Sequence, residues 1–497
     1  MITIQTTPLS YRIKALSTGQ LCGTHIYLEE YLRKFNLTTW DQRARRFILM
    51  KRYVHFCRRT SMLYIPRYDL DSFLDFLRKR GVEWRIEEIP LQTGKTIDIN
   101  LKPGVTDKNE KQTKGITQLL TSDEHLQGLS LNPGEGKTYC TIKVISVLKK
   151  RAFIACIGLV DQWIKSILQF TDLKKEDIYV IQGAPSVAKL LSQIDRNIHP
   201  KIIMCSLATL RGYVMDDESY GNYPPFDEIC DRLGIGIRVI DEAHLNFHLS
   251  LLTDLRTNAY LNIALTATFD RNEIQVKTIF NNHYPPRIRY GEDEFTQHVD
   301  IFSYSYTLGN MLMPQKAYHT ANGYNHSKME DYLLRKMPTK LEYVYDRFYA
   351  TAIYSHYVNI RKPGQKLLIL CSTIEMCKWF KRRMEIDLPK EDNFKICIYV
   401  NGTSDDELEV NDIIVSTPGS AGTGTDIKDL LTVIMTVATG SDILNKQSLG
   451  RLREIFGVTP NYAYFWNRDI IPHCNYQETR RITFTQRGKN YKEYTLG

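Results

Sequence analysis

The stretch LSLNPGEGKTYC, residues 129–140, contains the residue types that bind phosphate groups. Gly134 and Gly136 allow a tight turn whose backbone amides point at phosphate oxygens. Lys137 supplies a positive charge for the β- and γ-phosphates of a nucleotide, and Thr138 supplies a hydroxyl for Mg²⁺. The residue types therefore predict a phosphate-binding loop.

The surroundings of this loop agree with that prediction. The preceding LQGLSL is an apolar run typical of a buried strand, and the following YCTIKVISVLKK has the spacing of a helix. Leu131 stands where the general pattern GxxxxGK[ST] has its first glycine, which affects only the entrance to the turn. We include Glu135, between the two glycines, among the nucleotide-binding residues.

A second chemical stretch is IRVIDEAHLNF, in which an apolar strand ends at Asp241 and Glu242. Ligands of open α/β sheets bind at the carboxyl ends of the strands. Asp241 is suited to hold Mg²⁺ together with Thr138, and Glu242 to polarise an attacking water. Phosphoryl transfer requires positioning and charge neutralisation, which these few groups provide.

The composition is that of an ordinary globular protein. The 497 residues, 43% hydrophobic and 24% charged, are enough for about two to four domains. There is no long apolar run and no signal-peptide pattern, so we expect neither membrane insertion nor secretion and assign the chain to the cytoplasm, that of the host if the source is viral. The ten cysteines lack zinc-type spacing and indicate buried, reduced thiols.

The net charge of +9 is concentrated in DQRARRFILMKRYVHFCRRT, residues 41–60, where seven Arg or Lys accompany one Asp. A solvated basic face is the ordinary interpretation. Interleaved aromatic residues favour a polyphosphate partner instead. The candidate nucleic-acid-binding residues of this segment are Arg43, Arg45, Arg46, Arg52, Arg58 and Arg59.

The order of apolar patterns predicts three domains. Residues 1–100 read as a small basic α+β domain, with a helix in YDLDSFLDFLRKRG between two strands, and a polar linker follows at residues 93–115. Strands alternate with helices in two further blocks, which predicts two α/β lobes with parallel sheets. We set the lobes at residues 105–290 and 330–497.

From residue 105 to about 460 the chain resembles superfamily 2 helicases of the DEAH/DExH type, and within them the UvsW-like recombination helicases of phages and the XPB-like branched-DNA motors. The resemblance implies that both lobes are RecA-like and that Gln112 is a candidate reader of adenine. It also implies roles for four further motifs, LVDQW, MCSLATLRG, LTATFDR and SAGTGTDIKDL.

In such helicases these motifs contact the nucleic-acid strand or couple it to the nucleotide. The resemblance therefore implies phosphate contacts for Ser206 and Thr209 and coupling through Thr266 and Thr268. In the second lobe it implies strand and nucleotide contacts for Gly422, Thr423, Gly424 and Asp426. Each motif alone is also compatible with ordinary caps and turns.

The last motif, NKQSLGRLRE, resembles the arginine-finger pattern QxxGRxxR. Gln447 and Arg451 are in register, but Glu454 occupies the second arginine position and Arg453 lies one residue early. On a helix one residue is about 100° of rotation, so Arg453 would replace the missing arginine only outside a regular helix. We expect Arg451 to be the finger.

The resemblance implies an ATP- and Mg²⁺-dependent DNA translocase acting on branched DNA, with branch migration and recombination as its output and recombination or replication proteins as further partners. We expect a monomer. Two alternatives stay open: a DExH RNA helicase, and a nucleotide-gated DNA-binding or annealing protein with negligible ATP turnover.

Overall fold

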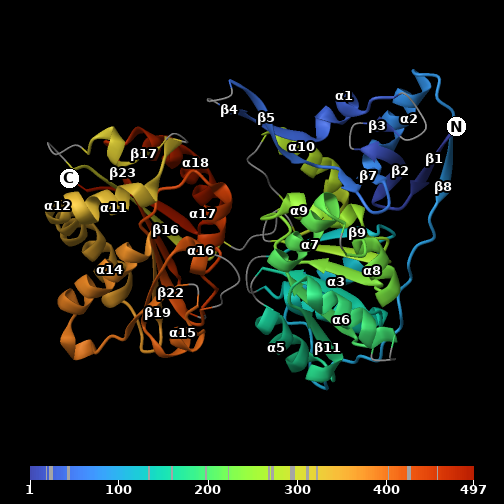
Figure 1. Ribbon diagram of the computed structural model, residues 1–497. Coiled ribbons are helices and arrows are strands. Elements are labelled where there is room, and N and C mark those ends of the chain that lie inside the picture. The colour runs from blue at the N-terminus through green and yellow to red at the C-terminus, as the bar shows by residue number, and fades with distance from the viewer. Residues whose placement is uncertain are drawn as a thin grey trace. The chain divides into compact units, whose positions relative to one another are not determined.

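The computed structural model describes residues 1–17, 20–21, 26–41, 45–131, 135–157, 160–195, 199–221, 223–266, 269, 274–291, 297–308, 313–320, 323–400, 402–421, 427–455 and 457–496. The chain divides into two compact units, Met1–Leu131 with Glu135–Asp293, and Glu294–Gly497. Figure 1 labels their elements. Within the described residues, no helix is both long and apolar enough to span a membrane.

The first unit begins with a small α+β module. Its mixed sheet has the order β6-β7-β2-β1-β8, with β3 paired to β2, and only β1 and β8 run parallel. The strands are β1 (Ile2–Thr6), β2 (Ser10–Ser17), β3 (Gln20–Leu21), β6 (His55–Cys57), β7 (Met62–Pro66) and β8 (Trp84–Glu88). Helices α1 (Glu29–Leu32) and α2 (Leu70–Arg78) and a separate hairpin, β4 (Asn36–Asp41) with β5 (Arg46–Arg52), complete it.

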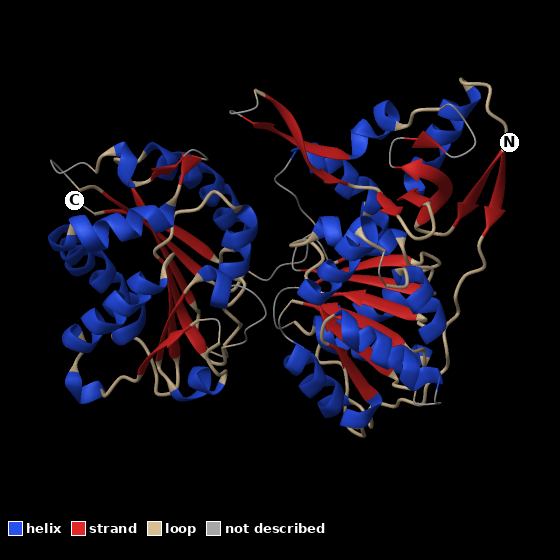
Figure 2. Cartoon of the chain, in the orientation of Figure 1, coloured by secondary structure: helices blue, strands red, loops and turns tan. Residues whose placement is uncertain are grey.

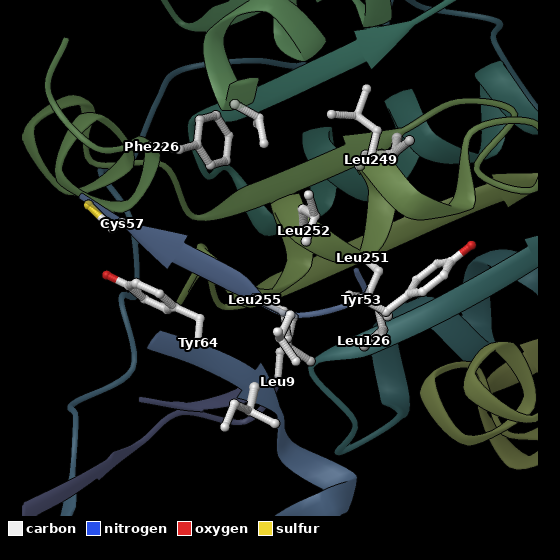
Figure 3. Close-up of a cluster of buried hydrophobic side chains, with 14 of the residues drawn as sticks. Leu9, Tyr53, Cys57, Tyr64, Leu126, Phe226, Leu249, Leu251, Leu252 and Leu255 are labelled. Carbon is white, nitrogen blue, oxygen red and sulfur yellow. The ribbon is translucent and has the colours of Figure 1, made fainter. Parts of the chain in front are cut away.

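The module shares one hydrophobic core with the lobe that follows it. Figure 3 shows module residues, among them Leu9, Tyr53 and Tyr64, packed with lobe residues Leu126, Phe226, Leu249, Leu251, Leu252 and Leu255. Buried polar contacts reinforce this contact surface, because Arg256 contacts His55 and pairs with Asp227 at 2.8 Å, and Tyr64 donates to Asp227 at 2.8 Å. The module is therefore docked on the lobe.

The segment at residues 93–115, which the sequence indicates as a polar linker, is instead packed on the first lobe. Ile97 and Ile99 are buried in the lobe's core. Gly94 has φ of 76°, and a β-carbon on it would lie 2.2 Å from the Cα of Gly236, so the two backbones pass too closely for any other residue. The end of the segment is helix α3 (Glu110–Thr121).

The first lobe is a parallel sheet of seven strands in the order β11-β12-β10-β13-β14-β9-β15. Its strands are β9 (Leu126–Ser130), β10 (Ala152–Cys156), β11 (Ile178–Ile181), β12 (Ile202–Ser206), β13 (Ile237–Ile240), β14 (Leu261–Thr266) and β15 (Arg289–Tyr290). The connecting helices are α4 (Lys137–Leu148), α5 (Val160–Phe170), α6 (Ala184–Asp195), α7 (Leu207–Ser219), α8 (Phe226–Leu233), α9 (Phe247–Leu255) and α10 (Ile274–His283).

The second lobe is another seven-stranded parallel sheet, in the order β20-β21-β19-β22-β23-β16-β24. Its strands are β16 (Asp300–Tyr306), β19 (Lys366–Leu370), β20 (Ile396–Tyr399), β21 (Ile413–Ser416), β22 (Leu430–Met435), β23 (Asn461–Asn467) and β24 (Asn490–Thr495). A small hairpin, β17 (His319–Thr320) with β18 (Gly323–Tyr324), lies between β16 and α11.

The helices of the second lobe are α11 (His326–Lys336), α12 (Pro338–Val344), α13 (Ala350–Ile353), α14 (Ile374–Asp387), α15 (Asp406–Val410), α16 (Pro418–Ala421), α17 (Asp442–Leu449) and α18 (Ile471–Arg487). Figure 2 shows helices on both faces of each parallel sheet. The two sheets confirm the prediction of two α/β lobes after an α+β domain. The domain boundaries remain predictions, and β16 lies upstream of the one at residue 330.

Candidate active site

The loop between β9 and α4 holds Lys137 against its own backbone. Lys137 is the first residue of α4, and its Nζ donates a hydrogen bond of 2.8 Å to the carbonyl oxygen of Leu131. Gly136 has φ of 97°, a conformation that favours glycine, and a β-carbon there would lie 2.3 Å from Gln112 Nε2 and displace that side chain. The N-terminus of α4, with Thr138 in its first turn, is suited to receive an anion.

Gln112 connects helix α3 with this loop. Its Nε2 donates to the carbonyl oxygen of Glu135 at 2.8 Å, and its Oε1 accepts from the backbone N–H of Lys108 at 2.8 Å. Lys111 pairs with the Glu135 carboxylate at 3.3 Å. The Gln112 amide still has one proton and one lone pair for a further hydrogen bond, so its contact with adenine stays a prediction.

Asp241 and Glu242 form the turn directly after β13. The backbone N–H of Glu242 donates to Asp241 Oδ1 at 3.0 Å, and Glu242 has φ of 50°, a left-handed conformation that is uncommon for a residue other than glycine. Residues held in such conformations cluster at functional sites. The local backbone thus presents two adjacent carboxylates at the end of a buried strand.

Asp241 also receives a hydrogen bond from an element far away in the sequence. Trp163 Nε1, on α5, donates to Asp241 Oδ2 at 3.0 Å. Burial and the charge of Glu242 raise the pKa of Asp241 to about 6, against the opposing effects of the Trp163 hydrogen bond and the charge of Lys137. Because β9 and β13 are strands of one parallel sheet, separated by β14, Lys137 and Asp241 follow strand ends at the same edge of that sheet.

His244 links Glu242 to the next strand of the sheet. Its Nδ1 lies 2.7 Å from the hydroxyl of Thr266, the last residue of β14, and 3.3 Å from Glu242 Oε2. His244 therefore connects the turn after β13 with the end of β14. The sequence predicts no role for His244, and it predicts that the LVDQW motif, which contains Trp163, lines the nucleic-acid strand. The contacts of His244 with Thr266 and of Trp163 with Asp241 are therefore seen only in the structure.

Ser206 and Thr209 lie at the end of β12 and the start of α7. The backbone N–H of Thr209 donates to Ser206 Oγ at 3.1 Å, and the two hydroxyl oxygens are 3.0 Å apart. This is an ordinary helix N-cap, in which one side-chain oxygen satisfies a free backbone donor. Both side chains are only half-buried, and their contact with nucleic acid stays a prediction.

The finger segment of the second lobe begins in α17 and continues beyond it. Gln447 is buried within the helix, which ends at Leu449, and Arg451 follows in a turn, 4% exposed. Arg453 is half-buried, and its Nη1 donates to the Gly450 carbonyl oxygen at 2.5 Å. Because the segment is not a regular helix, the rotation of about 100° between Arg453 and position 454 does not apply here. The side chain of Arg453 nevertheless closes the end of α17 through its contact with Gly450.

The described candidate arginines of residues 45–59 differ in their exposure. Arg45, Arg46, Arg58 and Arg59 are exposed. Arg52 is half-buried and pairs with Glu29 at 2.7 Å, which gives it a structural contact.

Seven of the sequence-predicted or implied residues lie outside the described part of the chain. They are Arg43, Gly134, Thr268, Gly422, Thr423, Gly424 and Asp426. Within the described ranges no cluster of three His, Cys, Asp or Glu side chains is arranged to hold a metal ion. Mg²⁺ does not need such a cluster, because it binds to nucleotide enzymes through one or two side chains together with phosphates and waters, and Thr138 and Asp241 fit that requirement.

No protein-family model and no curated protein matches the sequence. Solved structures do match its shape. LlaBIII, an ATP-dependent Type ISP restriction-modification enzyme bound to DNA, is similar with a TM-score of 0.50 and 12% identity, over 79% of this chain and 32% of that one. The chain thus spans about a third of that enzyme.

Two further matches have lower TM-scores. Dbp5 from S. cerevisiae, bound to RNA and ADP BeF3, has a TM-score of 0.49 and 13% identity, over 78% of this chain and 90% of that one. T4 UvsW has a TM-score of 0.36 and 13% identity, over 100% of this chain and 99% of that one. With its two parallel sheets and its likeness to LlaBIII, the chain has a fold of two tandem RecA-like lobes.

Proposed function

We propose that the protein is an ATP-driven DNA translocase that remodels branched DNA. The observation that carries this proposal is that β9, which precedes the loop with Lys137, and β13, which ends at Asp241 and Glu242, belong to one parallel sheet, so that the predicted phosphate loop and the carboxylate pair follow strand ends at the same edge. A non-catalytic nucleotide site has no need for Glu242 beside Asp241.

In this proposal the first lobe binds ATP and carries out its hydrolysis. Gly134, Glu135, Gly136 and Lys137 would surround the phosphates. Thr138 and Asp241 would hold Mg²⁺, which would supply positive charge to the phosphates. Glu242 accepts a proton from the attacking water, while Trp163 orients Asp241 through its 3.0 Å hydrogen bond. Arg451 of the second lobe acts as the arginine finger, supported by Gln447, Gly424 and Asp426.

The nucleic acid is bound through its backbone, which carries no sequence information. Ser206, Thr209 and Thr423 contact one strand, and the exposed Arg45, Arg46, Arg58 and Arg59, together with Arg43, hold a neighbouring duplex arm. The resemblance of the motifs to those of UvsW-like helicases supports branched DNA as the substrate, and with it branch migration during recombination.

The test is the steady-state ATPase rate without nucleic acid and with single-stranded DNA, duplex, a four-way junction and RNA. We expect stimulation by DNA, greatest with the junction. Lys137→Ala and Glu242→Gln should each lower the rate by roughly 10²–10⁴. Lys143→Ala is the matched control, because Lys143 lies on the same helix but pairs with Asp107 at 2.7 Å.

Each other outcome selects an alternative. Stimulation by RNA alone would identify an RNA motor. Rates equal to those of Glu242→Gln with every polymer, accompanied by tight DNA binding, would identify a binding or annealing protein.

A further inference from the structure

The β4–β5 hairpin exposes large apolar side chains to solvent. Trp40 is 51% exposed, Phe47 66% and Leu49 49%. Figure 1 shows the hairpin extending away from the rest of the N-terminal module. Single exposed apolar residues are common, but several together mark an interaction site.

The register of the hairpin places these side chains on one face. Trp40 lies directly opposite Phe47, and Thr38 lies opposite Leu49, two residues further along β5. Side chains two residues apart on a strand share a face. The Trp40 and Phe47 rings meet edge to face, with centroids 5.2 Å apart and an interplanar angle of 72°. The ring that contributes its edge leaves its own faces uncovered by the other.

The hairpin that carries this aromatic pair is also positively charged. Arg45, Arg46 and Lys51 are exposed on it, and Asp41 is the single acidic residue of its two strands. A protein partner for an apolar face would not require this excess of positive charge, whereas a polyanion would. Aromatic rings with interspersed cations are the combination by which proteins bind unpaired nucleotides, stacking on the bases and neutralising the phosphates.

The base of the hairpin is fixed to the lobe that carries the candidate active site. Arg52, the last residue of β5, donates to Glu29 at 2.7 Å and to Asn36 at 3.0 Å, and its carbonyl oxygen lies 2.8 Å from His248 Nε2. Tyr53 stacks on Phe247, with centroids 5.5 Å apart. Phe247 begins α9, the first helix after Asp241 and Glu242, so the base of the hairpin packs on the element that follows the carboxylates.

We propose that the β4–β5 hairpin binds unpaired DNA bases, with Trp40 and Phe47 stacking on them and Arg45, Arg46 and Lys51 contacting the phosphates where the unpaired strand joins the duplex arm. This inference rests on the proposed function for its choice of DNA, but it assigns a site that the motifs do not contain. It separates the hairpin, which grips bases, from the lobes, which contact the strand through its backbone.

The test compares binding of a duplex with a single-stranded oligodeoxythymidine tail to binding of a blunt duplex, at one fixed salt concentration. The double variant Trp40→Leu/Phe47→Leu keeps apolar area but removes the rings. We expect it to weaken binding of the tailed DNA by roughly tenfold to a hundredfold and to leave binding of the blunt duplex unchanged. Trp40→Phe should bind the tailed DNA nearly as the unaltered protein does.

Tyr27→Leu is the matched control, because Tyr27 is a 71% exposed aromatic residue of the same module outside the hairpin. An unchanged thermal unfolding curve of the double variant establishes that it folds. Equal affinity of the unaltered protein and the double variant for the tailed DNA would overturn the proposal, as would a loss confined to RNA tails or an effect only on self-association.

Failure of this inference and failure of the proposed function give different results. Loss of tail binding in the double variant, in a protein whose ATPase no DNA stimulates, would support the hairpin site and contradict the translocase. ATPase activity that DNA stimulates, together with unchanged tail binding in the double variant, would support the translocase and contradict the hairpin site.

Discussion

The two parallel sheets have the same topology but different residues at corresponding positions. Numbered along the chain within each lobe, both sheets have the strand order 3-4-2-5-6-1-7. After strand 1 the first lobe has the phosphate loop, and after strand 5 it has Asp241 and Glu242. At the latter position the second lobe has Thr436, whose hydroxyl donates to the Leu370 carbonyl oxygen at 2.8 Å.

In the second lobe, the hydrogen-bond donors that follow strand 1 are paired with a carboxylate of the same lobe. The hydroxyl of Thr307 and the backbone N–H of Leu308 donate to Asp469 at 2.7 and 2.9 Å. A carboxylate of the chain thus occupies donors at the position where the first lobe has the predicted phosphate loop. The shared fold provides the strand ends in both lobes, and the residues that follow the strands determine whether an external anion can bind there.

We expect the greatest loss of ATPase activity from a change at Arg451, and this change tests whether the second lobe contributes to hydrolysis. Arg451→Ala should lower the DNA-stimulated ATPase rate by roughly 10³–10⁵, the worth of an arginine finger. Arg453→Ala should have a much smaller effect, because Arg453 contacts the Gly450 carbonyl oxygen. Steady-state ATPase assays and nucleotide binding measured separately would check this. A greater loss with Arg453→Ala would reverse the assignment of the two arginines.

An intermediate effect is expected from Trp163 of the first lobe, and a tryptophan of the second lobe is its control. Trp163→Phe removes the donor to Asp241 but keeps most of the ring, and a hydrogen bond to a charged group is worth about 1.5–3 kcal/mol, so kcat should fall by at least about tenfold. The control is Trp466→Phe, whose indole donates to Ser303 at 3.1 Å in the second lobe. Measuring kcat over a range of Mg²⁺ concentrations would separate metal binding from turnover, and equal rates for both variants would contradict a special role for Trp163.

The smallest effect on activity is expected for Glu330, a carboxylate of the second lobe that is 2% exposed. It accepts hydrogen bonds from the backbone N–H groups of Ser372 and Thr373, at 2.8 and 2.7 Å. Burial raises the pKa of Glu330 to about 7, so the folded state binds its proton more tightly than the unfolded state does. Its contribution to stability is present below about pH 4.5 and is lost as pH rises to about 7.

Glu330→Gln should therefore leave the ATPase rate unchanged and flatten the decline of unfolding free energy between pH 5 and pH 8, by at most about 3 kcal/mol. Urea unfolding at both pH values would measure the difference. Equal declines in the two proteins would mean that Glu330 ionises in the folded state as readily as in the unfolded state.

The lobes were predictable where their strands are continuous apolar runs. AFIACIG and KIIMCS predict buried parallel strands, and β10 and β12 confirm them. Strand β16 escapes this reasoning because its sequence, DIFSYSY, alternates serine with aromatic residues. Its serines are nevertheless buried, and their hydroxyls are satisfied by contacts such as that between Trp466 Nε1 and Ser303.

The site was predictable only where its residues are adjacent in sequence. The phosphate loop and the Asp241–Glu242 pair are contiguous motifs. The hydrogen bond from Trp163 to Asp241 depends on β10 lying beside β13, and the contact of His244 with Thr266 depends on β13 lying beside β14. Strand order is a property of the folded chain, so these pairs could not be inferred from local patterns.

The close passage of Gly94 against Gly236 limits how the protein can be divided. A fragment that begins at residue 105 would lack Ile97 and Ile99, which are buried in the core of the first lobe. It would therefore expose the apolar groups that these two side chains cover. Proteolysis in this segment would likewise uncover apolar groups of the first lobe. Fragments intended to isolate the first lobe should therefore start before Gln92, whose side chain donates to the Cys230 carbonyl oxygen at 3.1 Å.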